Sequence, residues 1–409
     1  MTFKTRCRVL ALGAMLLSVP AAAQTSAGVD LGTLGGDSAT AVQINVFGAI
    51  VGSSHTPIGS YRAFVMPTPG AEMVPLGPEA LVSDGQGIND LNDVVFFAGQ
   101  IFVQRGSLVR ALGPLTATDV NNLGFVAGWR YADPNELHAT VWDPSGTARD
   151  LGVAGQVSGA TAINDRGQVA GWVAAEGSLH AVLWEADGTL VPLGTLGGDY
   201  SQAMAINEAG DIVGIAETAT QSAHAFLWRQ GIGMIDLDAG NAFSWAFGIN
   251  DVGQIVGERF ASGATHGTAF VWTQAAGMQS LATPTMPDGV GRASSINDLG
   301  EIVGSAADAT RSRAFEWFVP PARDAQFSAL ARLVNQLAAD GIINRGGAQS
   351  FTAQINAASR ALAAGRLDLA GHHLETAARH LARADAGAAQ GRIVHVAAFA
   401  GRLALALRP

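Results

Sequence analysis

One nine-residue stretch decides the fold of this chain: Ile249-Asn250-Asp251-Val252-Gly253-Gln254-Ile255-Val256-Gly257. Close relatives of it begin at Ile206 and Ile296, and looser copies begin at Ile44, Ile88, Val120 and Ile163. In each copy an apolar segment ends at asparagine, a turn follows in which glycine is available for positive φ, and an apolar segment returns. The stretch therefore predicts a β-hairpin that occurs seven times.

The spacing of the seven asparagines indicates a repeat of about 43 residues. The intervals are 44, 32, 43, 43, 43 and 47 residues, between Asn45, Asn89, Asn121, Asn164, Asn207, Asn250 and Asn297. Two further segments recur in phase with the hairpin: an apolar strand that ends in tryptophan, as in residues 224–228, and a strand that runs into Leu-Gly, as in residues 190–194. Each period thus predicts four short strands, which make one blade of a β-propeller.

The two ends of the array predict a closed ring. After Trp317 the seventh unit lacks its Leu-Gly strand, yet an additional copy, Val29-Asp30-Leu31-Gly32, precedes the first hairpin. If this N-terminal strand completes the last blade, the ring closes and no sheet edge is left open. The unit around Asn89 is short and has Asn92 and Phe96 where glycines usually stand. The sequence therefore predicts an all-β, seven-bladed propeller at residues 24–319 and leaves six blades as the alternative.

The first 23 residues have the pattern of a signal peptide. Lys4, Arg6 and Arg8 precede an apolar run at residues 9–17, and the small residues 21–23 form a cleavage site. Cys7 is the only cysteine and would leave with this segment, so no disulfide is expected. The apolar run is too short to span a bilayer. We therefore expect a bacterial protein that is secreted or periplasmic and has no membrane span.

Residues 322–409 are predicted to form a small all-α bundle. Apolar residues recur at helical spacing in three stripes that begin at Phe327, Phe351 and Leu367, and residues 393–407 predict a fourth helix. A membrane-surface helix is the alternative for that last segment. Charge also divides the chain, because residues 24–321 contain 29 acidic and 11 basic residues whereas the rest of the mature chain contains 5 and 10. The acidic propeller is not expected to bind nucleic acid, because binding to phosphates needs a basic face.

Two family resemblances rest on these motifs. His224-Ala225-Phe226-Leu227-Trp228, the segment from Asp30 to Gly36 and the asparagine hairpin together resemble the bacterial extracellular HAF-repeat family over residues 29–318. Residues 333–337, 341–344 and 362–365 resemble the FIMAH domain over about residues 326–384. The resemblances imply an exported repeat protein, usually without an assigned activity, that ends in an accessory domain.

The sequence contains no recognisable motif for catalysis or metal binding. No Gly-x-Ser-x-Gly, phosphate loop or dinucleotide fingerprint occurs, and the asparagine turns lack a calcium-binding ladder of aspartates. His138, His180 and His224 recur once per blade, too far apart to share a metal ion, and the histidines in residues 372–380 lack tight ligand spacing. We therefore expect no catalytic residue, no metal site and no cofactor. A carbohydrate-active enzyme with dispersed carboxylates stays open, as does a purely structural surface protein.

The loops that join a Leu-Gly strand to the next blade are the best binding candidates. If the Leu-Gly strand is outermost, these loops cross one face of the ring toward its axis. Aspartates beside aromatic rings suit hydrogen bonding to a sugar and stacking on it. The predicted ligand-binding residues are Asp37, Ser38, Asp199, Tyr200, Ser201, Phe243 and Trp245. We expect a non-catalytic binding or interaction module for a glycan or another cell-envelope component, with the helical domain available to a protein partner.

Overall fold

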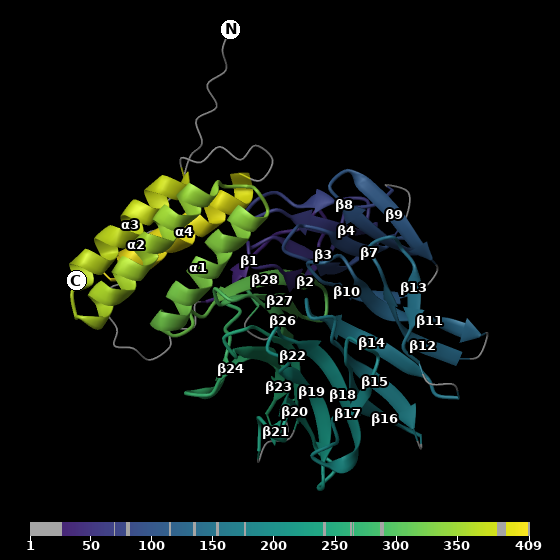
Figure 1. Cartoon of the computed structure of the whole chain (residues 1–409). Coiled ribbons are helices and arrows are strands. Elements are labelled where there is room, and N and C mark those ends of the chain that lie inside the picture. Colours follow the sequence, from purple (N-terminus) through teal and green to yellow (C-terminus); the bar gives the residue numbers. More distant parts are fainter. Residues whose placement is uncertain are drawn as a thin grey trace.

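Seven small β-sheets and four helices make up the structure (Figure 1). The computed structural model describes residues 27–407 except 69, 79–81, 114–115, 134–135, 153–154, 176, 240–242, 262–263, 265, 287–289 and 383–389. The predicted signal peptide lies outside the described residues. Each sheet has four antiparallel strands, and the first strands of neighbouring sheets pack beside one another around a common axis. The chain is therefore a seven-bladed β-propeller followed by a four-helix region, and the predicted fold class is confirmed.

The first six blades each contain four consecutive strands, with the first strand innermost. Blade 1 has β2 (Ala39–Ile44), β3 (Ile50–His55), β4 (Tyr61–Met66) and β5 (Val74–Pro75). Blade 2 has β6 (Asp84–Ile88), β7 (Val94–Phe97), β8 (Ile101–Arg105) and β9 (Leu108–Gly113). Blade 3 has β10 (Thr116–Val120), β11 (Val126–Asp133), β12 (Glu136–Trp142) and β13 (Ala148–Asp150).

Blades 4 to 6 follow the same order. Blade 4 has β14 (Ser158–Ile163), β15 (Val169–Ala175), β16 (Ser178–Trp184) and β17 (Leu190–Pro192). Blade 5 has β18 (Gly197–Ile206), β19 (Ile212–Thr218), β20 (Ala223–Arg229) and β21 (Gly233–Asp236). Blade 6 has β22 (Phe243–Ile249), β23 (Ile255–Phe260), β24 (Thr268–Thr273) and β25 (Gly277–Ser280).

The seventh blade is assembled from the two ends of the propeller segment. It contains β26 (Val290–Ile296), β27 (Glu301–Ala307), β28 (Ser312–Phe318) and, as its outermost strand, β1 (Val29–Asp30). In β1 Asp30 lies opposite Phe315 of β28. Nε and Nη2 of Arg313 donate to the Asp30 carboxylate at 2.9 and 3.0 Å. The N-terminal strand thus closes the ring, as the additional repeat copy predicts.

Blade 2 is complete despite its irregular sequence. Asn92 has φ 63°, the left-handed conformation that glycine adopts in the corresponding turns. Phe96 stands where the other blades have glycine, and it lies opposite Gly85, where the other blades have alanine. The exchange of the small residue between the two strands leaves room for the ring. The six-bladed alternative is therefore wrong.

The recurring asparagines bind neighbouring blades to each other. Each of the seven is buried, and its side-chain amide donates to the backbone oxygen of the asparagine in the next blade at 2.9–3.1 Å. The last donor, Asn297, reaches Asn45 of blade 1 and completes the circle. The side-chain oxygen accepts N–H groups of its own turn, as for Asn207. The predicted turn-forming role is thus only part of what these residues do.

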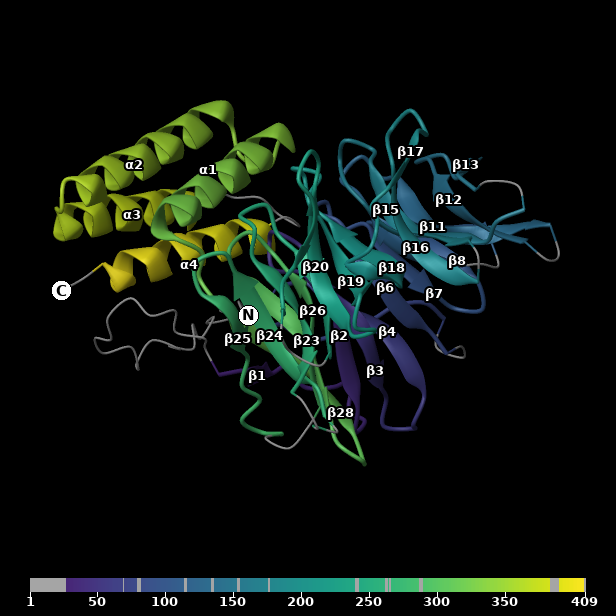
Figure 2. The same ribbon diagram turned by 90° about the horizontal axis from the view of Figure 1, so that it is seen from below.

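The four helices share one apolar core that includes two residues of the propeller. They are α1 (Arg323–Ala339), α2 (Arg345–Ala363), α3 (Leu367–Ala382) and α4 (Gln390–Ala406). Phe47 of blade 1 and Leu299 of blade 7 are almost fully buried in this core. In both views the helices lie on one side of the propeller, far from β12 and β13 (Figures 1 and 2). The helical domain therefore packs where the two ends of the propeller meet. Within the described part of the chain, no helix combines the length and apolarity needed to cross a membrane.

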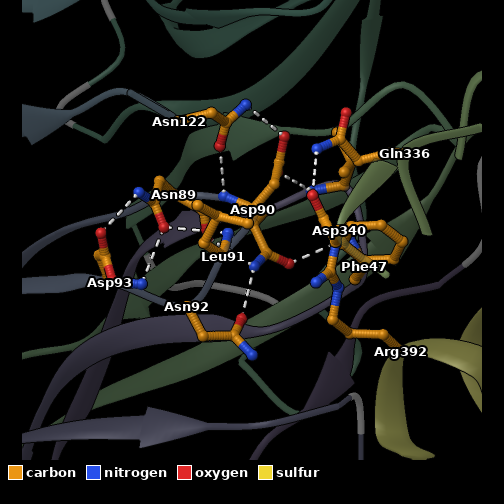
Figure 3. Close-up of polar contacts among 12 residues, drawn as sticks. Phe47, Asn89, Asp90, Leu91, Asn92, Asp93, Asn122, Gln336, Asp340 and Arg392 are labelled. Carbon is orange, nitrogen blue, oxygen red and sulfur yellow. Dashed lines mark hydrogen bonds and ion pairs between the residues drawn. The ribbon is translucent and has the colours of Figure 1, made fainter. Parts of the chain in front are cut away.

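Arginine side chains of the helical domain add polar contacts at this interface. The guanidinium of Arg392 in α4 lies 3.8 Å from the centre of the Phe47 ring and binds Asp340 at 2.6 Å (Figure 3). Asp90 accepts the backbone N–H of Val46 at 3.0 Å and a hydrogen bond from Asn122 at 2.8 Å. Burial raises the pKa of Asp90 to about 6, against the hydrogen bonds that it accepts. The first turn of the propeller is thus held by a neighbouring blade and by a helix.

Candidate functional site

The propeller has two faces that carry different connections. Because successive strands of a blade are antiparallel, the asparagine turns and the turns between third and fourth strands lie on one face, which we call the turn face. The connections between blades and those between second and third strands lie on the other, which we call the loop face. The helices pack on the turn face, through Phe47 and Leu299. The predicted ligand-binding loops lie on the loop face.

The two predicted aspartates are exposed on the loop face. Asp37 pairs with Nδ1 of His55 at 2.9 Å, and this hydrogen bond lowers its pKa. Asp199 is exposed to solvent, and its backbone N–H donates to Glu217 at 2.9 Å. Ser38 accepts the N–H of Ser312 at 3.3 Å. Blades 1 and 5 are not neighbours, so these two loops do not form one site.

Ser201 is buried between two blades, which corrects its prediction as a ligand-binding residue. Its side chain is fully buried, and its hydroxyl accepts the N–H of Ala181 at 2.9 Å and donates to Gly194 at 2.8 Å. Serines at the same position in three other blades accept the corresponding N–H of the preceding blade: Ser83, Ser158 and Ser244. The hydroxyl thus links two blades, and its burial keeps it out of reach of a sugar.

An aromatic stripe follows one side of β22. Phe243, Trp245 and Phe247 are partly exposed, with 5.5 Å between the first two rings and 5.8 Å between the last two. The guanidinium of Arg292 lies 3.6 Å from the centre of the Phe247 ring. Nε1 of Trp245 is shielded from solvent and has no hydrogen-bond partner among the described residues. In the neighbouring blade Tyr200 is half-buried and donates to Gln202 at 2.8 Å.

Two tryptophans that the sequence analysis did not propose extend the aromatic surface. Trp129 in β11 and Trp172 in β15 are partly exposed, and their rings are 6.4 Å apart. Trp172 lies opposite Gly159, where an added Cβ would come within 2.7 Å of the indole ring. The missing side chain therefore lets the indole cover the innermost strand. The signal was present, because both tryptophans stand eight residues after the blade's asparagine.

At one shared position of the innermost strand, the type of side chain varies among the blades. The residues five positions before the asparagines are Thr40, Asp84, Thr116, Gly159, Gln202, Trp245 and Arg292. Opposite Trp245 lies Glu258, which is buried; burial raises its pKa, and the charge of Arg292 opposes this. No cluster of three potential metal ligands occurs in the described ranges. This face can therefore offer stacking surfaces, amides, hydroxyls and carboxylates to one ligand.

Comparison with protein families assigns the C-terminal part of the chain. Residues 327–393 match the FIMAH domain. The match covers α1 to α3 and the start of α4, and it confirms the C-terminal resemblance noted in the sequence. No curated protein matches the chain in sequence.

Solved structures similar to the chain are propeller proteins of low sequence identity. TolB from Acinetobacter baumannii is 10% identical, with 67% of this chain and 81% of that chain covered and a TM-score of 0.38. A mutant puromycin hydrolase is 13% identical, with 70% and 54% covered and a TM-score of 0.49; this chain thus spans about half of it. A gluconolactonase from Xanthomonas campestris is 11% identical, with 73% and 99% covered and a TM-score of 0.38. Identities in this range concern the fold and not the activity.

Proposed function

We propose that this chain is an exported, non-catalytic binding protein whose propeller recognises a carbohydrate on its loop face. The group of partly exposed aromatic rings on that face carries the proposal: Trp129, Trp172, Tyr200, Phe243 and Trp245. Aromatic faces pack on the apolar faces of sugar rings, and such rings are costly to expose without a ligand that uses them.

Polar side chains between the rings complete this site. Gln202, Thr116 and Asp84 lie at equivalent positions of three innermost strands, and the Asp199 carboxylate stands at the entrance of blade 5. The helices leave this face open because they pack on the turn face. The proposal includes membership of the HAF-repeat family, export to the periplasm or the medium, and a glycan of the cell envelope as the ligand.

A carbohydrate-active enzyme is the second candidate, because of one observation. Glu258 is buried beside Trp245 and its pKa is raised, as in a carboxylic acid that donates a proton to a glycosidic oxygen. Hydrolysis of chromogenic glycosides by the wild type and its loss in Glu258→Gln would establish this candidate. Binding without turnover supports the non-catalytic proposal.

The test is a glycan array followed by calorimetric titration of the best ligand. Trp129→Ala should weaken binding by about 1–3 kcal/mol, the usual effect of truncating an aromatic anchor. Tyr131 lies on the same strand and is 56% exposed, so Tyr131→Ala is the matched control and should leave affinity unchanged. Asp199→Asn should weaken binding by removing a charged acceptor.

Thermal melts of these variants come before any titration. If Trp129 only packs between blades, its truncation should lower stability by about 3–5 kcal/mol whatever the ligand. No saturable binding to any glycan, or equal weakening by Trp129→Ala and Tyr131→Ala, would remove the site.

A further inference from the structure

On the turn face, most junctions between blades are closed by polar side chains of the blades themselves. Between blades 2 and 3, Arg105 binds Asp93 at 3.1 Å and donates to the Gly124 oxygen at 2.6 Å. Beside the junction with blade 6, Arg229 binds Asp211 within blade 5 at 2.9 Å. Beside the junction with blade 5, Gln168 pairs with Glu185 within blade 4, and between blades 6 and 7 Gln254 donates to the Val319 oxygen. One residue of each contact stands four positions after the blade's asparagine: Asp93, Gln168, Asp211 and Gln254.

At the junction between blades 7 and 1, which we call the seam, side chains of helix α4 occupy the place of this polar pair. Glu301 stands four positions after Asn297 and is 2% exposed. It binds Nε2 of His395 at 3.0 Å and Nη2 of Arg402 at 2.9 Å. Phe399 stands between them on α4, and the centre of its ring is 6.3 Å from that of Phe318. A helix thus fills the space that a polar pair fills elsewhere.

The junction between blades 3 and 4 has neither closure. The residues that line this junction hold the same repeat positions as residues at the seam. Leu123 corresponds to Leu299, Phe125 to Glu301 and Val141 to Glu316. Asp143 corresponds to Phe318, and Arg166 to Phe47. The Asp143 carboxylate is already bound to N–H groups of its own turn at 2.8 and 2.9 Å. A cavity of about 450 Å³ remains there. Leu123 at its edge is 59% exposed, whereas Leu299 is fully covered by the helices.

We propose that this cavity is a docking site for an amphipathic helix of a partner protein. The same place in the repeat already receives a helix at the seam, which argues for a helix as the occupant. Phe125 and Val141 replace the two carboxylates that face α4, so the incoming helix presents aliphatic or aromatic side chains where α4 has His395 and Arg402. The cavity lies on the turn face and is independent of the proposed carbohydrate site.

The probe is a synthetic peptide with the sequence of residues 390–407 that carries His395→Leu and Arg402→Leu. We expect saturable binding to the full chain by fluorescence anisotropy and weaker binding of the unmodified peptide, because its charges would be buried against Phe125 and Val141. Leu123→Asp should weaken binding about tenfold or more, because it replaces an apolar contact at the edge of the cavity with a charge. Leu91→Asp is the matched control, because Leu91 holds the same position in blade 2 and is 43% exposed.

Three results would overturn the proposal. The first is that the substituted peptide does not bind. The second is equal binding by the wild type and Leu123→Asp, once melts have shown that the variant is folded. The third is concentration-dependent dimerisation that Leu123→Asp abolishes, since a second copy of the chain would then be the occupant.

Discussion

The seam between blades 7 and 1 and the junction between blades 5 and 6 solve the same problem by different means. The main chain crosses the internal junction on the loop face, and on the turn face an ion pair within blade 5, Arg229–Asp211, lies next to the Asn207 bond. At the seam, residues 31–38 cross the loop face from β1 of blade 7 to β2 of blade 1, and α4 covers the turn face. Both junctions keep the asparagine hydrogen bond. The chain is discontinuous within blade 7, where β1 pairs with β28 and non-covalent contacts hold the two strands together.

The difference identifies which contacts close the ring and which repeat for local reasons. Apolar burial of Phe47 and Leu299 and the buried Glu301 cluster occur only at the seam among the junctions described. The seam should therefore be the place where the propeller opens first.

Removal of β1 should have the largest effect. Deletion of residues 24–36 removes the outer strand of blade 7 and the partner of Arg313, and we expect a loss of about 5 kcal/mol in the free energy of unfolding. The bare edge of β28 should cause association. Urea denaturation and analytical ultracentrifugation measure both effects. An unchanged, monomeric truncated protein would mean that the seam does not depend on β1.

The two carboxylates at the seam should show opposite pH dependence. Burial opposes ionisation of Glu301, but the charge and hydrogen bond of His395 and the charge of Arg402 outweigh it and lower the pKa to about 2. Its contribution is thus present above its ordinary pKa of 4.5 and is lost as the pH falls from there to about 2. Glu301→Gln should cost about 3 kcal/mol at pH 7 and little at pH 2, in urea titrations across pH.

Glu316 provides the matched comparison on the same surface. Burial and the charge of Glu301 raise its pKa to about 8, against the charge of Arg402. Its favourable contribution is present below 4.5 and is lost as the pH rises toward 8. Glu316→Gln should therefore raise the melting temperature at pH 8 and not at pH 4. Equal pH profiles for both variants would show that these groups are not buried against α4.

The asparagine ring should give the smallest effect and compares the two junctions directly. Asn207→Ala removes one donated bond and leaves the N–H groups of its turn unpaired, so we expect a loss of about 2 kcal/mol. Asn297→Ala should cost about 1 kcal/mol more, because Asn297 also donates to the charged Glu301 at 2.8 Å. Calorimetric melts measure both. A smaller loss for Asn297→Ala would contradict the special role of the seam.

Much of the fold followed from the sequence because it depends on local rules that repeat. The hairpin around each asparagine, the strand that ends in tryptophan and the additional strand at residues 29–32 were enough to predict seven closed blades. The hydrogen bonds between blades and the docking of α4 could not be predicted. They join residues far apart in the chain, such as Glu301 and His395, and no spacing rule encodes that proximity.

The candidate site was predicted less completely than the fold. Alignment of the loops placed Tyr200, Phe243 and Trp245 on one face, but it treated Ser201 as part of the same loop. Its hydroxyl instead faces the neighbouring blade, because side chains alternate along a strand. Trp129 and Trp172 were missed because they belong to second strands, and Trp172 can cover the innermost strand only because the opposite residue, Gly159, has no side chain.

The asparagine ring has a consequence for how the number of blades is fixed. Between blades, each amide donates to the backbone oxygen of the next asparagine, and rings with any number of repeats would satisfy these donors and acceptors. These hydrogen bonds therefore fix how neighbouring blades are joined but do not determine how many blades the ring contains. The number of blades is instead set by the side chains that fill the space between blades and by β1, which must pair with β28 after one full turn of the ring. A chain with one duplicated repeat would keep every hydrogen bond between neighbouring blades, but β1 would have to pair with β28 around a larger ring.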